Sequence, residues 1–89
     1  TNAVLVLADS TELVRLKSAL ESAKQESRAP NSLRVYGPSA NGSDSAKLTL
    51  LVNPSDLLEL VALLREMNKR RAISKKPMLS YRVNPYSLD

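Results

Sequence analysis

The order of apolar segments along the chain predicts a two-layer α+β domain. Four short stretches are continuously apolar or alternate apolar with polar residues, which is typical of strands. Two longer stretches repeat apolar residues every three or four positions, which is typical of helices. The order is strand, helix, strand, strand, helix, strand, known as the ferredoxin-like or split βαβ arrangement. We therefore expect a four-stranded antiparallel sheet with two helices on one face, in a single domain over residues 1–89.

The first strand and the first helix are predicted between residues 3 and 27. Residues 3–8 are a continuous run of Ala, Val and Leu, which predicts a strand buried on both faces. Asp9 is a suitable N-cap for the helix, because its carboxylate can accept from a free backbone N–H of the first turn. The helix should end by Ser27, since Pro30 disfavours helical geometry at the residue before it. Its narrow apolar stripe consists of Leu13, Leu16, Leu20 and Ala23.

The two middle strands are expected on either side of a turn. Residues 33–36 alternate apolar and polar side chains and predict a short edge strand. Residues 37–45 are polar and contain Asn41-Gly42, a favourable tight-turn pair, so we expect an irregular connection there. Residues 46–52 predict the next strand, which is central and mostly apolar. One of its faces carries Leu48, Leu50 and Val52, and the other carries Lys47, Thr49 and Leu51.

The second helix, over residues 53–71, has the richest apolar face of the chain. Asn53 is the expected N-cap, Pro54 suits the first helical position, and Asp56 could complete a weak capping box. The helix should end near Ala72, and a basic connector then leads to a last strand over residues 78–83, which Asn84-Pro85 terminates. The apolar face consists of Leu57, Leu60, Val61, Leu64 and Met67.

The composition removes most catalytic and metal chemistry. The chain has no Cys and no His, which excludes disulfides, thiolate or imidazole metal ligands and a Ser–His pair. Its two glycines form no phosphate-binding loop. We therefore expect a protein that is not an enzyme and that has no cofactor and no metal site.

Positive charge is concentrated in one segment. Residues 65–82 hold seven basic residues and one acid, a net charge of +6, whereas the remainder of the chain has a net charge of −2. Such a cluster can contact phosphate without reading sequence, and a neighbouring tyrosine can stack on an unpaired base. The alternative is that the cations are helix caps and solvated ends, and that Tyr81 faces the core. The candidate nucleic-acid-binding residues are Lys69, Arg70, Arg71, Lys75, Lys76, Tyr81 and Arg82, with Tyr86 as a second stacking candidate.

Two classes of function remain open. The leading hypothesis is a non-enzymatic RNA-binding or ribonucleoprotein accessory module, whose partner is RNA or another polyanion. The central strands contain no aromatic residue, which argues against the standard mode in which bases stack on those strands. The alternative is a protein-interaction or dimerisation module that uses the open sheet face or an edge strand, and a small-ligand regulatory domain is a third class. No apolar run approaches the roughly 20 residues that span a bilayer, so we expect no membrane partner.

Overall fold

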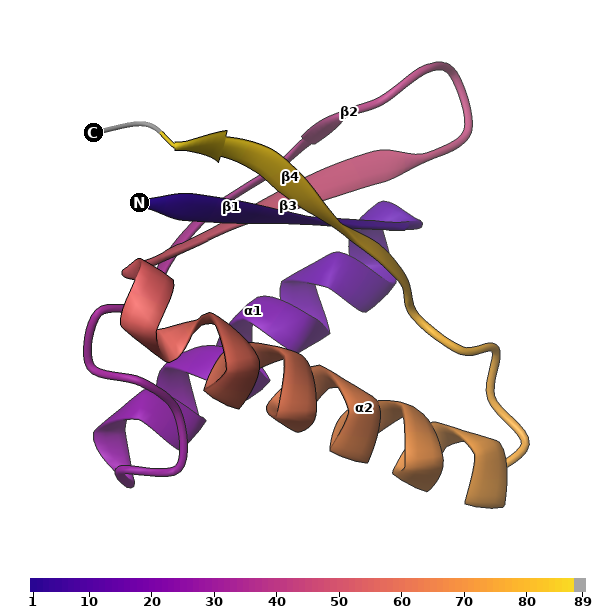
Figure 1. Cartoon of the computed structure of the whole chain (residues 1–89). Coiled ribbons are helices and arrows are strands. Elements are labelled where there is room, and N and C mark those ends of the chain that lie inside the picture. The colour runs from indigo at the N-terminus through magenta and orange to yellow at the C-terminus, as the bar shows by residue number, and fades with distance from the viewer. Residues whose placement is uncertain (88–89) are drawn as a thin grey trace.

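The chain adopts the predicted ferredoxin-like α+β fold. The computed structural model describes the backbone of residues 1–87 and the side chains of residues 1–84. One antiparallel sheet has the strand order β2-β3-β1-β4, and both helices lie against the same face of it (Figure 1). The elements are β1 (Asn2–Ala8), α1 (Ser10–Gln25), β2 (Arg34–Ala40), β3 (Ala46–Val52), a 3-10 turn (Pro54–Asp56), α2 (Leu57–Ile73) and β4 (Ser80–Ser87).

The register of the strands divides the sheet into a covered face and an open face. Residues directly opposite in an antiparallel pair point to the same side. Val6 pairs with both Leu48 and Tyr81, and all three pack in or against the core beneath the helices. The covered face and the helices share a core of aliphatic side chains that includes Val4, Val6, Leu13, Leu20, Leu48, Leu50, Leu60 and Leu64.

The expectation that the first strand is buried on both faces is wrong. Val4 and Val6 are fully buried, but Leu5 and Leu7 point to the open face and keep part of their surface exposed. Ala3 on the same open face is buried because it is small. A continuous apolar run indicated two covered faces, but both α-helices of the described residues cover the same side of the sheet (Figure 1).

The second strand is longer than expected and runs through the first part of the predicted turn. It continues to Ala40, with an irregular register between Tyr36 and Ser39. Gly37 lies inside this irregularity at a φ of +107°, and a Cβ there would approach the Lys47 carbonyl oxygen to 3.0 Å. Only glycine fits both the positive φ and the close approach, so this residue allows the strand to resume.

Two lysines of α1 bind the carbonyl groups of the β2 segment. Lys17 Nζ donates to the Gly37 carbonyl at 2.9 Å, and Lys24 Nζ donates to the Leu33 carbonyl at 2.7 Å. Both side chains therefore serve structure rather than forming part of a free cationic surface.

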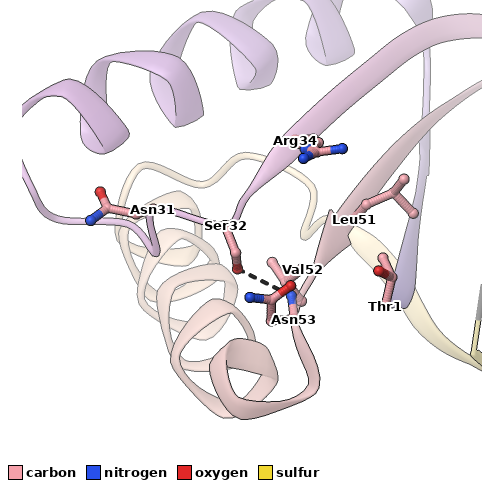
Figure 2. Close-up of a pocket in the computed structure, with 7 residues that line it drawn as sticks. All are labelled: Thr1, Asn31, Ser32, Arg34, Leu51, Val52 and Asn53. Carbon is pink, nitrogen blue, oxygen red and sulfur yellow. Dashed lines mark hydrogen bonds between the residues drawn. The ribbon is translucent and has the colours of Figure 1, made fainter. Parts of the chain in front are cut away.

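The helix starts differ from each other. The Asp9 carboxylate accepts from the Glu12 N–H at 2.8 Å, which confirms the first cap. The predicted Asn53 cap is wrong, because its side chain makes no capping bond and a 3-10 turn precedes α2. Ser32, in the loop before β2, makes the bond that a capping box would require of Asp56: its hydroxyl accepts from the Asn53 N–H at 3.1 Å (Figure 2). The same hydroxyl donates to the Asp56 carboxylate at 2.6 Å. Asp56 is thus used by a loop distant in sequence instead of a capping box.

The last strand begins two residues later than predicted and continues past its predicted end. It starts at Ser80 and runs through Asn84-Pro85 to Ser87, with a register shift opposite Asn2 and Ala3. Its position on the outside of the sheet explains why Pro85 is tolerated, since an edge strand has one unpaired side.

A buried amide fixes the approach to this strand. Asn68 lies on the core side of α2 with a relative exposure of 6%. Its Nδ2 donates to the Leu79 carbonyl at 3.2 Å, and its Oδ1 accepts from the Leu79 N–H at 2.7 Å. Both polar groups of Leu79 are therefore satisfied by one side chain, which holds the connector against the end of α2.

We expect Asn68→Ala to destabilise the domain by about 2–4 kcal/mol, because it leaves a buried N–H and a buried carbonyl without partners. Asn68→Asp should also destabilise it, since a carboxylate can accept from the Leu79 N–H but cannot donate to the carbonyl. Urea unfolding followed by circular dichroism measures both. Leu58→Ala on the same helix is the control, because Leu58 is 83% exposed and should change stability by less than about 0.5 kcal/mol. A destabilisation by Asn68→Ala no larger than the control's would show that the clamp is not needed.

Candidate nucleic-acid interface

Cations from three segments converge on the groove between α1 and α2, called here the helix groove. It has a volume of about 280 Å³ and is lined by residues from α1, the end of α2 and the connector that follows α2. Its apolar floor is formed by Leu16, Ala19, Met67 and Leu79, and its charged wall by Glu12, Arg15, Arg70, Arg71 and Lys76.

In the helix groove, the Arg71 side chain is bonded to other groups of the domain. Its Nη1 donates to Glu12 Oε2 at 2.9 Å, and its Nε donates to the Pro77 carbonyl at 2.6 Å. The two side chains of this ion pair are only 17% and 28% exposed, so the pair is partly shielded from solvent. Arg71 therefore neutralises the one carboxylate of the groove and, three residues after Asn68, also fastens the connector.

Three other cations of the helix groove keep their charge free. Arg15, Arg70 and Lys76 form no ion pair within residues 1–84, and Arg70 and Lys76 are exposed. With Glu12 already paired, the groove has an unbalanced positive charge on an apolar floor. That combination suits an anionic ligand that also has an apolar part.

Lys69 and Tyr81 lie on the other side of α2. A second groove of about 320 Å³ separates α2 from β4 and is lined by Arg65, Lys69, Tyr81 and Met78 among others. Lys69 is 3.9 Å from Glu66, a loose exposed pair of little energetic weight. Tyr81 packs partly against the core, as the alternative interpretation of the sequence held. The side chain of Tyr86 lies outside the described residues.

The remaining predicted site residues are separate from both grooves. Arg82 pairs in register with Leu5 and therefore points to the open face, on the opposite side of the sheet from the helices. Lys75 is exposed in the connector at a φ of 57°, and its N–H donates to the Ala72 carbonyl at 3.1 Å. The predicted set thus does not form one cluster: Arg70, Arg71 and Lys76 share the helix groove, Lys69 and Tyr81 share the second groove, and Lys75 and Arg82 lie apart.

The structure adds charged residues that the sequence interpretation did not select. Arg15 joins the helix groove from α1, and its place beside Arg70 depends on helix packing that no local pattern shows. Arg34, Lys47 and Arg82 share the open sheet face, because their register partners Leu51, Ser39 and Leu5 do so. The alternation over residues 33–36 could have placed Arg34 and Tyr36 on one face. The pairing of this strand with the others depends on tertiary structure, so local sequence could not show which residues of other strands share that face.

A larger hollow at the opposite end of the sheet is a weaker candidate. It has a volume of about 440 Å³ and contains a single guanidinium, that of Arg34, among amide, hydroxyl and apolar groups (Figure 2). Its lining consists of Thr1, Asn31, Ser32, Arg34, Leu51, Val52 and Asn53. The Ser32 hydroxyl is already used by Asn53 and Asp56, so little of this polarity is free for a ligand.

Comparison with known proteins gives no family for the chain. No protein-family model matches it, and no curated protein and no solved structure matches it either. Within the described residues no group of three or more carboxylates is placed to hold a metal ion. None of the helices there is long and apolar enough to cross a bilayer.

We expect Arg71→Ala to destabilise the domain by about 1–2 kcal/mol, because it removes a partly buried ion pair and the bond to the Pro77 carbonyl. Arg71→Lys should recover only part of this stability, since an ammonium cannot reproduce the forked geometry that reaches both partners. Arg70→Ala, one residue away and exposed, is the matched control and should stay within about 0.5 kcal/mol of the parent. Urea unfolding of the three variants makes the comparison, and equal destabilisation at positions 70 and 71 would contradict this assignment.

Proposed function

We propose that this protein is a non-enzymatic RNA-binding or ribonucleoprotein accessory module that contacts phosphate groups through the basic end of α2. The observation that carries the proposal is the helix groove, where Arg15, Arg70 and Lys76 keep unpaired charge while Arg71 neutralises Glu12. The Arg71 side chain is used for structure. The side chains of Arg15, Arg70 and Lys76 make no such bond within residues 1–84 and remain available to a ligand.

The rigidity of the groove supports the proposal. Asn68 and Arg71 tie the connector to α2, so Lys76 is presented from a segment whose backbone is fixed at Leu79 and Pro77. The Lys76 N–H also donates to the Arg71 carbonyl at 2.8 Å. Fixed cations give up less conformational freedom on binding than flexible ones, which favours affinity for a phosphate backbone.

A phosphate chain fits this surface better than an acidic protein segment does. The free cations come from α1, α2 and the connector rather than from one ordered row, and binding to phosphate needs charge and hydrogen-bond donors but no fixed sequence of partners. The open face and β4 remain available for a protein partner. The helix groove contains the unpaired positive charge that the RNA-binding hypothesis requires.

We expect the double variant Arg70→Gln/Lys76→Gln to weaken binding to a single-stranded RNA oligonucleotide and to reduce its salt dependence. Removing one cation that neutralises a phosphate should lower the slope of log affinity against log salt by about 0.7, so removing two should lower it by roughly 1.4. Fluorescence anisotropy with a labelled uridine 12-mer, over a series of salt concentrations, measures both quantities.

The control is Arg28→Glu, which changes the net charge by the same two units at the far end of α1. Arg28 is exposed and paired only with Glu26, so its substitution should leave the slope unchanged. If the control and the double variant alter the slope equally, binding follows total charge, and the assignment to the helix groove fails.

A further inference from the structure

Among the described side chains, the open face of the sheet carries cations and no carboxylate. Twelve side chains from the four strands face this side within residues 1–84, and three of them are basic. All the acidic residues of this part of the chain lie in α1, in α2, in the turns beside these helices or in the β2–β3 turn. The face consists of Ala3, Leu5, Leu7, Arg34, Tyr36, Ser39, Lys47, Thr49, Leu51, Ser80, Arg82 and Asn84.

Within residues 1–84, one aromatic side chain stands among these cations. Tyr36 is 51% exposed on the open face of the edge strand β2. The register aligns it in one row with Thr49, Leu5 and Arg82 across the four strands. From strand spacings, Arg34 is roughly 7 Å from Tyr36 along β2 and Arg82 is roughly 15 Å away across the sheet.

We propose that this face binds an unpaired nucleic-acid strand, with Tyr36 stacking on a base and Arg34, Lys47 and Arg82 contacting the backbone. Base stacking on an aromatic ring combined with a basic track is how proteins hold single strands without reading their sequence. Leu5, Leu7 and Leu51 are half-buried and give an apolar floor for the next bases. The inference rests on the proposed function for the class of ligand, but it concerns a different surface of the molecule.

Charge decides between this ligand and a second copy of the chain. Two open faces packed together would lie about 10 Å apart and enclose six cations, with no carboxylate among the described side chains of either face to balance them. Like charges in a desolvated interface oppose association. A polyanionic strand removes the same repulsion and covers the same apolar floor, so the nucleic acid is the occupant that the face favours.

The test separates stacking from charge. Tyr36→Ala should weaken binding of a labelled uridine 12-mer by roughly 5- to 100-fold, the range expected for one base on one aromatic ring. Its affinity for inorganic polyphosphate, which has charge but no bases, should stay within about twofold of the parent. Tyr36→Phe should bind the uridine 12-mer like the parent, and Leu58→Ala, which removes exposed apolar surface from α2, should have no effect.

Three results would decide whether Tyr36 forms a stacking site. Unchanged uridine binding by Tyr36→Ala, or an equal weakening of uridine and polyphosphate binding, overturns the stacking site. A dimer in analytical ultracentrifugation that dissociates on Tyr36→Ala also overturns it, because a second copy would then cover the face. Amide resonances of Leu5, Tyr36 and Thr49 that shift when the oligonucleotide is added to the unaltered protein support it without any variant.

The two proposals fail independently. If Tyr36→Ala weakens binding while Arg70→Gln/Lys76→Gln does not, the sheet is the site and the helix groove is not. The reverse result retains the helix groove and removes the sheet. Weaker binding in both variants supports a strand that contacts both sides of the domain, and unchanged binding in both removes both proposals.

Discussion

The position of β4 and of the helix groove depends on one constraint. The connector after α2 is attached to the helix that precedes it. Asn68 and Arg71 are one helical turn apart, and together they bind the backbone at Leu79 and Pro77. The connector contains no regular secondary structure, so its backbone groups need partners from elsewhere. Because α2 supplies them, the short segment between helix and strand has a defined position, and Leu79 enters the core directly before β4 begins.

The same constraint explains how a small aliphatic core holds a highly charged chain. Buried polar side chains are costly unless they are hydrogen-bonded, and Asn68 is fully satisfied by the backbone it fixes. Within residues 1–84 no buried side-chain nitrogen or oxygen lacks a partner. Charged groups that serve structure, such as Arg71 with Glu12 and Lys17 with Gly37, are bonded inside the domain. Of the lysine and arginine side chains with neither an ion pair nor a hydrogen bond within residues 1–84, three lie in the helix groove and three on the open sheet face, whereas Arg65 and Lys75 lie elsewhere.

Local patterns were sufficient for the fold but not for the site. Apolar spacing identified both helices and all four strands, because each element has to bury a face of the correct period. The patterns failed at two places. The Asn53 side chain does not cap the helix, and its backbone N–H is bound by Ser32, which is distant in sequence. Gly37 lets β2 continue through a predicted turn. The sequence shows that basic residues are concentrated in residues 65–82. It does not show that the fold places some of them in the helix groove and Arg82 on the open sheet face. Arg82 points away from Arg70 because β4 alternates its faces, and only the pairing of the strands places Tyr36 on the same face as Arg82.

The bonds from Lys17 and Lys24 to the β2 segment have a consequence for solubility. An edge strand presents unpaired carbonyl oxygens that can recruit a strand from a neighbouring molecule. Here two carbonyls of the segment that includes β2 are already occupied by ammonium groups from α1. Acetylation of either lysine would remove its charge and replace the ammonium by a bulkier amide with a single N–H, which would weaken the bond to that carbonyl. This border of the sheet would then become more open to strand exchange and to aggregation.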